Sequence, residues 1–319
     1  MFTAEKGIHE PYGWDEITMK GAGHEIRILP AAGFNLWYWS YEGNEILMKP
    51  VDIRVFGTKY GIPILFPTPN RIPNGEYIWQ GKARIMRKHG ERVLIHGLVK
   101  DELFTVLELS AGEEEAICRA RIVINEKSPL FEGWPFPCIL EVTYLLRSDG
   151  LRMKAEVTNT GDEEMPFGFA VHPYFSKRGN ANKVELTVPV GRVYEADENL
   201  FPTGRILPAD DAHIIADGYH TVESLYLDNV YRGMTADMEA KIRYEDIVLH
   251  ISGSDCFRNV VVFTPHDRPG FCIEPQTCST NFINLHTQGF IDESGLLVLP
   301  AGQKFSCWVD FITEKRVNA

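Results

Sequence analysis

Long apolar runs are missing from this 319-residue sequence. No stretch approaches the roughly 20 consecutive apolar residues that a membrane-spanning helix needs. The opening residues, MFTAEKGIHEPYGWDEITMK, also lack the continuous apolar segment of a signal peptide. We therefore expect neither a membrane partner nor export.

An excess of basic residues is missing as well. The sequence has 32 Lys and Arg against 44 Asp and Glu, which gives a formal net charge of −12 and a pI near 5.3. Binding to nucleic acid needs clustered Lys and Arg to contact phosphates, so a nucleic-acid partner is not expected. The acidity mainly favours solubility.

Closely spaced cysteine pairs are the third absence. None of the six cysteines forms a CxxC motif, and most lie in apolar, strand-like runs. This pattern is typical of reduced core cysteines in a cytoplasmic protein. No group of Cys and His residues has the spacing of metal ligands, so we predict no metal site. The cysteines are Cys118, Cys138, Cys256, Cys272, Cys278 and Cys307.

Helical periodicity never persists over 11–18 residues, and the dominant pattern is that of strands. The segment 138–161 predicts a long hairpin, because both arms alternate and Ser148, Asp149 and Gly150 supply a turn. A short helical turn is expected around 221–226. Further strands are predicted within 25–30, 34–42, 45–49, 104–109, 117–124, 184–190, 240–253, 259–265 and 305–313.

The 19 prolines and 27 glycines are spread along the chain as turn residues. The sequence shows no linker, low-complexity tract or clear internal repeat. We therefore expect an all-β fold, a large antiparallel β-sandwich formed by residues 1–319 as a single domain.

Two loops carry polar residues that strands do not need. In PTPNRIPNGEY, 67–77, prolines stiffen a loop that holds Asn70 and Arg71. A plain surface turn with a solvated arginine is the alternative. In VLIHGLVKDE, 93–102, His96 closes an apolar run, and a structural histidine at a strand end is the alternative.

Two further segments place ionisable groups in apolar surroundings. His172 lies within FGFAVHPYFS, 167–176, where the following proline restricts the backbone. Glu274 follows Phe-Cys-Ile at the end of an apolar strand, where a carboxylate is rarely buried without a purpose. A satisfied core histidine and a rim carboxylate are the respective alternatives. Gln276, two residues on, can share the face of Glu274, and Asp228 in YLDNVYRG suits a turn.

An ordered set of short motifs resembles the aldose 1-epimerase, or galactose mutarotase, family from about residue 20 to residue 313. The resemblance implies a β-supersandwich with an open groove, catalytic roles for His172 and Glu274, and sugar-binding roles for Arg71, His96 and Asp228. We add Asn70 and Gln276 as candidate substrate-binding residues. The motifs are NRI at 70–72, HG at 96–97, HPYF at 172–175, FPTG at 201–204, DN at 228–229, IEPQ at 273–276 and LPAGQKF at 299–305.

The sequence departs from the galactose-type pattern at the catalytic histidine. That pattern continues as His-Ser-Tyr-Phe-Asn-Leu, whereas this chain has His-Pro-Tyr-Phe-Ser, which is nearer to the sugar-phosphate and uncharacterised branches. HGLVKDELF likewise resembles HGFAR of the phosphate branch, with Lys100 where that branch has arginine. A free aldohexose and a hexose 6-phosphate both remain candidate substrates. The net charge of −12 would repel a phosphate dianion at long range and so favours the free sugar, and the basic residues near the loop motifs that could override this are Arg71, Arg84 and Lys100.

The implied reaction interconverts the α and β anomers of an aldose through ring opening, which requires one proton acceptor and one proton donor. A carboxylate suits the base and an imidazolium the acid, so Glu274 is the expected base and His172 the expected acid. The reaction requires neither a redox step nor a metal, so no cofactor is expected. A glycosidase with Glu274 and Asp228 as its two carboxylates would leave His172 without a role. A carbohydrate-binding protein could do without either member of the pair.

Overall fold

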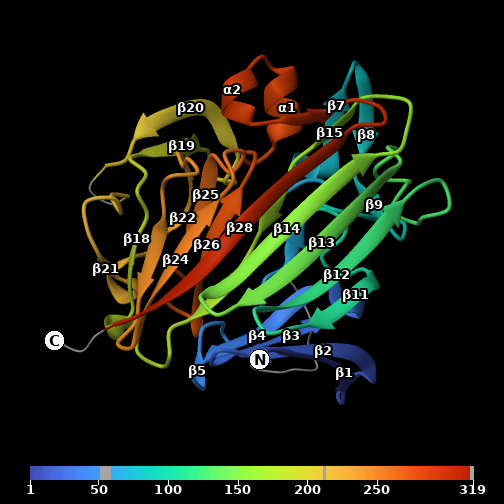
Figure 1. Cartoon of the computed structure of the whole chain (residues 1–319). Coiled ribbons are helices and arrows are strands. Elements are labelled where there is room, and N and C mark those ends of the chain that lie inside the picture. The colour runs from blue at the N-terminus through green and yellow to red at the C-terminus, as the bar shows by residue number, and fades with distance from the viewer. Residues whose placement is uncertain (51–58, 211–212, 317–319) are drawn as a thin grey trace.

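Strands dominate the computed structural model, which describes residues 1–50, 59–210 and 213–316. Within these residues the chain forms two large antiparallel sheets, a smaller N-terminal sheet and three two-stranded pairs. Figure 1 shows the N-terminal sheet at one end of the large sheets and the two short helices at the opposite end.

The first large sheet has nine strands and contains the predicted hairpin. Residues along β13 alternate between buried and half-buried over most of the strand, as expected for a sheet with one face against the core. Its order is β11 (Thr105–Ala111), β12 (Glu115–Ile124), β13 (Cys138–Arg147), β14 (Gly150–Asn159), β28 (Lys304–Lys315), β24 (Ile247–Gly253), β23 (Ala240–Arg243), β18 (Glu185–Thr187) and β21 (His220–Thr221).

The second large sheet has eight strands and positions the candidate site. Its central strand, β26, is buried along its whole length. Its order is β20 (Pro202–Pro208), β19 (Arg192–Ala196), β22 (Asp228–Arg232), β25 (Asn259–Phe263), β26 (Gly270–Gln276), β16 (Ala170–Val171) and β6 (Ile64–Leu65), and β17 (Tyr174–Ser176) also pairs with β26.

The remaining described elements close the ends of these sheets. The N-terminal sheet follows chain order with β1 (Thr3–His9), β2 (Trp14–Gly21), β3 (His24–Leu29), β4 (Asn35–Tyr41) and β5 (Asn44–Glu45). The paired strands are β7 (Glu76–Trp79) with β8 (Lys82–Ile85), β9 (Arg87–Lys88) with β10 (Glu91–Arg92), and β15 (Met165–Phe167) with β27 (Leu297–Leu299). The helices are α1 (Phe282–Thr287) and α2 (Ile291–Ser294), with 3₁₀ turns at Pro30–Ala32, Pro73–Gly75, Ala181–Lys183 and Val222–Ser224.

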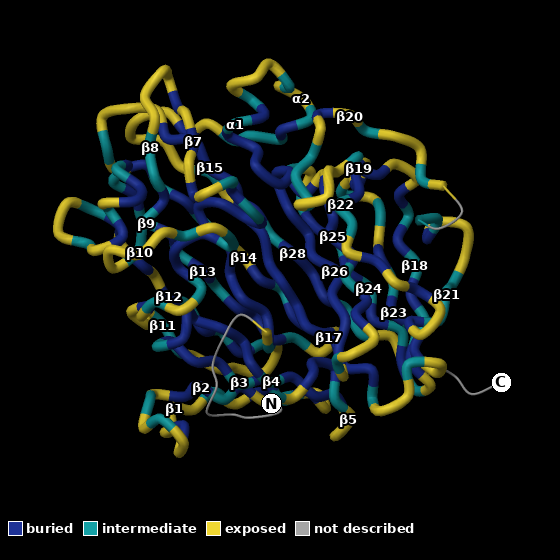
Figure 2. The backbone as a smooth tube through the Cα atoms, turned by 180° about the vertical axis from the view of Figure 1, so that it is seen from behind, coloured by how far each residue is buried: buried dark blue, intermediate teal, exposed yellow. Residues whose placement is uncertain are grey.

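Aromatic contacts join the sheets into one core. Phe311 of the nine-stranded sheet meets Phe175 of the eight-stranded sheet at 6.4 Å between ring centroids. The same Phe311 ring meets Trp39 of the N-terminal sheet edge-on at 6.1 Å. All three side chains are fully buried, and Figure 2 shows the buried strands running through the middle of the molecule with exposed loops at its rim. The predicted antiparallel β-sandwich is therefore confirmed.

Most predicted strands are present, with shifts of a few residues at their ends. The hairpin over 138–161 forms as β13 and β14, and the turn around 221–226 contains a 3₁₀ segment. The predicted strand at 45–49 is wrong beyond its first residue, because β5 ends at Glu45. The sequence reasoning also missed β1 and β2. Across the described part of the chain, none of the helices is long and apolar enough to span a bilayer.

Candidate active site

Glu274 lies in the interior of β26, so its predicted place at a strand end is wrong. The residue is only 3% exposed, which also excludes a carboxylate on the rim. Successive residues of a strand point to opposite faces, so Cys272, Glu274 and Gln276 share one face of the sheet. Gln276 therefore shares the face of Glu274, as their spacing predicted, and its amide donates a hydrogen bond to Glu274 Oε2 at 3.2 Å.

His172 lies opposite Glu274 on the neighbouring segment. Ala170 in β16 pairs with Gln276, and Tyr174 in β17 pairs with Cys272, so the register on both sides places His172 across from Glu274. Directly opposed residues of antiparallel strands present their side chains on the same face. The strand is interrupted here at Pro173, which has no N–H to donate.

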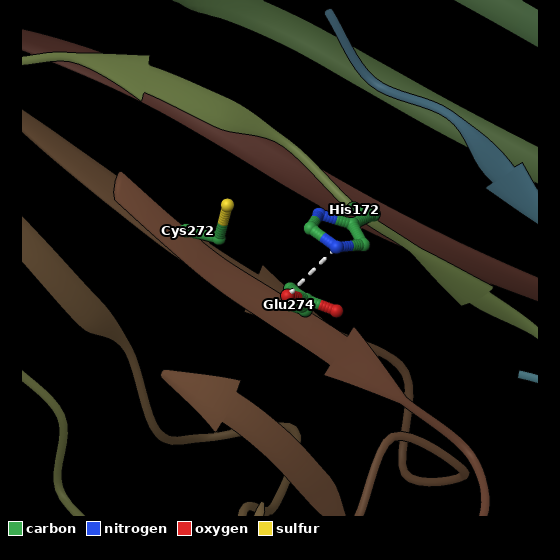
Figure 3. A group of neighbouring side chains, drawn as sticks. All are labelled: His172, Cys272 and Glu274. Carbon is green, nitrogen blue, oxygen red and sulfur yellow. Dashed lines mark ion pairs between the residues drawn. The ribbon is translucent and has the colours of Figure 1, made fainter. Parts of the chain in front are cut away.

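The two side chains meet in a buried contact. His172 Nε2 lies 3.2 Å from Glu274 Oε1 (Figure 3). The ring of Tyr174 stacks on the imidazole at 4.6 Å and 10°, and its hydroxyl lies 3.4 Å from His172 Nε2. The imidazole is thus held in one orientation by a ring on its face and by polar groups at Nε2.

Burial sets the protonation of this pair. It lowers the pKa of His172 to about 3, and the positive charge of Arg268 acts in the same direction. Burial also raises the pKa of Glu274 well above its ordinary value, assisted by the negative charge of Asp228. Both shifts favour the neutral forms.

Several buried polar atoms beside the pair have no hydrogen-bond partner within the described residues. They are His172 Nδ1, His96 Nδ1 and Gln276 Oε1. An unpaired buried polar atom costs roughly 1–3 kcal/mol. A polar ligand could partner the two histidine nitrogens, because His96 and His172 both line the cavity described below.

The two polar loops predicted from the sequence lie side by side against the pair. Arg71 forms an isolated bridge with Ile95, and the His96 amide donates to the Asn70 carbonyl oxygen at 2.9 Å. Asn70 and His96 both have left-handed φ angles, +58° and +67°. A Cβ atom on Gly97 would lie 2.4 Å from the backbone oxygen of the neighbouring loop, so the close approach requires glycine.

His96 belongs to the site rather than to a simple strand end. Its ring meets the His172 ring edge-on, with 5.1 Å between centroids. Burial lowers the pKa of His96 well below its ordinary value, and the positive charges of Lys100 and Arg71 add to this effect. His96 is therefore a neutral imidazole at neutral pH, suited to hydrogen bonding with a hydroxyl group.

Asp228 approaches the site from the other side. It is the first residue of β22, so the predicted turn aspartate is wrong in its local structure. One Asp228 carboxylate oxygen lies 4.0 Å from Arg71 Nη2, and the Asn70 side-chain oxygen accepts from the Arg71 amide at 2.8 Å. Asn70, Arg71 and Asp228 thus form one polar group beside the buried pair.

A cavity of about 240 Å³ brings these groups together. Gln276 is a predicted site residue that does not line it, although its amide donates to Glu274. Arg84 and Lys100 also lie away from the lining. The predicted residues that line the cavity are Asn70, Arg71, His96, His172, Asp228 and Glu274.

Sequence reasoning missed three polar residues in this lining: Lys59, Tyr174 and Arg268. Tyr174 lies two residues after the predicted catalytic histidine, so alternation could have indicated it. Lys59 and Arg268 lie outside the recognised motifs and gave no local signal. Val261 and Phe263 of β25 and Ile95 form apolar parts of the same wall.

Cys272 adds a potential metal ligand behind the pair. The ligand atoms of His172, Cys272 and Glu274 all lie within 4.8 Å of one another, and all three residues are buried. Figure 3 shows the Cys272 sulfur on the His172 side of β26. Spacing along the sequence did not reveal this group, because one member is a hundred residues away from the other two.

The arrangement of the strands is shared with solved proteins of the galactose mutarotase-like fold. A galactose mutarotase-like protein from Clostridium acetobutylicum superposes with a TM-score of 0.85, at 20% identity and over 99% of both chains. A galactose 1-epimerase from Lactobacillus acidophilus gives a TM-score of 0.80, at 15% identity and again over 99% of each. At these identities the likeness shows the fold.

The sequence profile described as Aldose 1-epimerase matches residues 36–311, and the chain belongs to this family. The uncharacterised protein YihR of Escherichia coli K12 is 25% identical over 238 residues, which cover 73% of this chain and 74% of that protein. The family resemblance seen in the sequence is therefore confirmed.

Proposed function

We propose that this protein is an aldose 1-epimerase that interconverts the α and β anomers of a free aldohexose. The observation that carries the proposal is the His172–Glu274 pair, held at 3.2 Å on one wall of the cavity. The anomeric hydroxyl and the ring oxygen of an aldose are bonded to the same carbon. Two proton-transferring groups this close together can therefore reach both oxygens at once.

The reaction begins with Glu274 as the base. Its carboxylate removes the proton of the C1 hydroxyl while His172 delivers a proton to the ring oxygen. The C1–O5 bond breaks, and the open-chain aldehyde forms. Rotation about C1–C2 presents the other face of the carbonyl, and the ring recloses with the two proton transfers reversed.

The scheme requires both members of the pair to be charged before the proton transfers begin. Burial favours the neutral form of each group, whereas the forward step needs an ionised Glu274 and a protonated His172. One transfer across the 3.2 Å contact produces the reactive form. Arg71 favours the Glu274 carboxylate, and hydroxyl groups of the bound sugar would stabilise both charges.

The remaining polar groups are suited to orienting the sugar. Arg71 and Asp228 can donate to and accept from adjacent hydroxyls, as charged groups that make strong hydrogen bonds. Asn70 fixes the Arg71 loop, and neutral His96 can contact a hydroxyl near the reacting carbon. Gln276 serves by holding Glu274 rather than by touching the sugar.

A hexose 6-phosphate is the second candidate substrate. The supporting observation is that Lys59 and Arg268 line the cavity in addition to Arg71. This local set of cations can attract a phosphate in spite of the net charge of −12. A non-catalytic sugar-binding protein is the remaining alternative, and it would not need the buried acid–base pair.

The decisive experiment is polarimetry on freshly dissolved α-glucose, α-galactose and glucose 6-phosphate. We expect the purified protein to speed equilibration of a free hexose, with the higher kcat/KM on the free sugar, and EDTA to leave the rate unchanged. A clear advantage for glucose 6-phosphate would select the second candidate. Sugar binding by calorimetry without any gain in rate would reject the enzyme.

A further inference from the structure

Three different ligand types meet behind the proposed catalytic contact. His172 offers an imidazole nitrogen, Cys272 a sulfur and Glu274 a carboxylate oxygen, and every pair of these atoms lies within 4.8 Å. Zn²⁺ binds such atoms at about 2.0–2.3 Å, so tetrahedral ligands stand roughly 3.3–3.7 Å apart. His172 Nε2 and Glu274 Oε1, at 3.2 Å, already have nearly that separation. A rotation of the short Cys272 side chain that moves its sulfur by about 1 Å would complete the set.

The strand register makes this grouping a fixed feature of the fold. Cys272 and Glu274 share one face of β26, and His172 is held between two segments that pair with that strand. Cys272 packs among Met48 and Tyr174 and does not itself line the cavity. The nitrogen and the carboxylate face the cavity. An ion can therefore enter from the cavity and find the thiol as its deepest ligand.

The charges of the three ligands match a divalent cation. A thiolate and a carboxylate together carry two negative charges, and the imidazole is neutral. The complex with a divalent ion is thus uncharged, which avoids the large cost of an uncompensated charge in a buried place. Thiolate and imidazole are the ligands that select Zn²⁺ and similar soft cations over Mg²⁺ and Ca²⁺.

We propose that His172, Cys272 and Glu274 form a binding site for Zn²⁺ or a similar thiophilic divalent cation, and that the bound ion blocks the sugar site. The three protein ligands leave a fourth tetrahedral position towards the cavity, which a water molecule can fill. The ion occupies His172 Nε2 and Glu274 Oε1, the same atoms that the proposed epimerisation uses. Metal binding itself does not depend on that activity, whereas the inhibition rests on it.

Co²⁺ is the direct probe of the thiol ligand. On titration of the parent protein, we expect a thiolate-to-cobalt charge-transfer band in the near ultraviolet and the release of protons from the ligands. Cys272→Ala should lose the band and bind Zn²⁺ at least ten times more weakly by calorimetry. Cys118→Ala, a buried cysteine of the other large sheet, is the matched control and should keep both signals.

Only folded variants can test the site, so Cys272→Ser is prepared in addition to Cys272→Ala. A thermal melt checks that each variant is folded. Absence of the band in the parent, or its persistence in the folded Cys272 variants, overturns the proposal. If the parent mutarotates a sugar, Zn²⁺ should inhibit it competitively, with an inhibition constant raised at least tenfold by Cys272→Ala. Inhibition that both variants share equally with the parent would reject the blocking role. A parent that binds Co²⁺ through the thiol but turns over no sugar would reject the epimerase alone.

Discussion

Replacing Glu274 with glutamine is expected to stabilise the fold while it removes the proposed base. Burial and the charge of Asp228 raise the pKa of Glu274 well above its ordinary value. A carboxyl group of this kind gives its full contribution to stability below its unfolded pKa. That contribution is lost as the pH rises towards the folded pKa, because the folded protein keeps a proton that the unfolded chain releases. Glutamine cannot ionise and therefore escapes this loss.

The magnitude follows from a single retained proton. Over the range from about pH 5 up to the folded pKa, the free energy of unfolding of the parent should fall relative to that of Glu274→Gln by up to about 1.4 kcal/mol per pH unit. The glutamine oxygen can still accept from Gln276, so the local hydrogen bond is kept. The pKa shift of His172 is common to both proteins at first order. Its effect therefore largely cancels in the difference between their free energies of unfolding.

The assay is urea unfolding followed by tryptophan fluorescence at half-unit steps between about pH 5 and pH 8. Glu156→Gln controls for the loss of one carboxyl group, since Glu156 lies half-exposed beside Lys304 in the nine-stranded sheet. That control should show no comparable slope. A difference between the parent and Glu274→Gln that stays constant with pH would refute the reasoning, because it would mean that Glu274 is ionised in the folded protein.

Four further substitutions give independent tests, three of them in the cavity lining and one, His24→Gln, in the N-terminal sheet. Arg71→Ala and Asp228→Ala should each weaken sugar recognition by about 1.5–3 kcal/mol in kcat/KM, mainly through a higher KM. If both variants are unfolded at the assay temperature, the two residues have a structural role instead. Tyr174→Phe keeps the aromatic ring that stacks on His172 but removes the hydroxyl group 3.4 Å from His172 Nε2. Because only one hydrogen bond is lost, kcat should fall only about 3–10-fold. A loss of kcat above 100-fold would make Tyr174 a proton-transfer group. Burial lowers the pKa of His24 to about 4, below its unfolded value, so the contribution of His24 to stability is present above about pH 6.5 and is lost as the pH falls. Between pH 7 and pH 5 the free energy of unfolding of the parent in urea should therefore fall by about 2 kcal/mol more than that of His24→Gln. Equal losses in the two proteins would contradict this.

Local patterns predicted the elements whose signal is local. The hairpin of β13 and β14 carries its alternation and its turn within 24 consecutive residues, so its position was readable. The strand β1 gave no such signal, because most of its residues are exposed on both faces at the edge of its sheet. Among the described residues, β1 pairs with the adjacent strand β2 on one side.

The site itself depends on pairing that no local pattern contains. Motif resemblance indicated His172 and Glu274, but their contact arises from the register of β26 with the two segments around Pro173. Asp228 looked like a turn residue because Asp-Asn is turn-like, whereas pairing with β25 extends it into a strand. Lys59 and Arg268 reach the cavity only through the folding of distant loops, so the cationic part of the lining was not predicted.

Mutarotation by the two pair variants tests the central claim most directly. Glu274→Gln and His172→Asn are compared with the parent by polarimetry on the preferred sugar, and sugar binding is measured by calorimetry on the same preparations. Loss of a positioned acid or base typically costs about 10²–10⁴-fold, so kcat should fall by that factor in each variant with only modest weakening of binding. The double variant should be little worse than the worse single one. Near-parental kcat in either folded single variant would contradict the assignment of that residue to the acid–base pair.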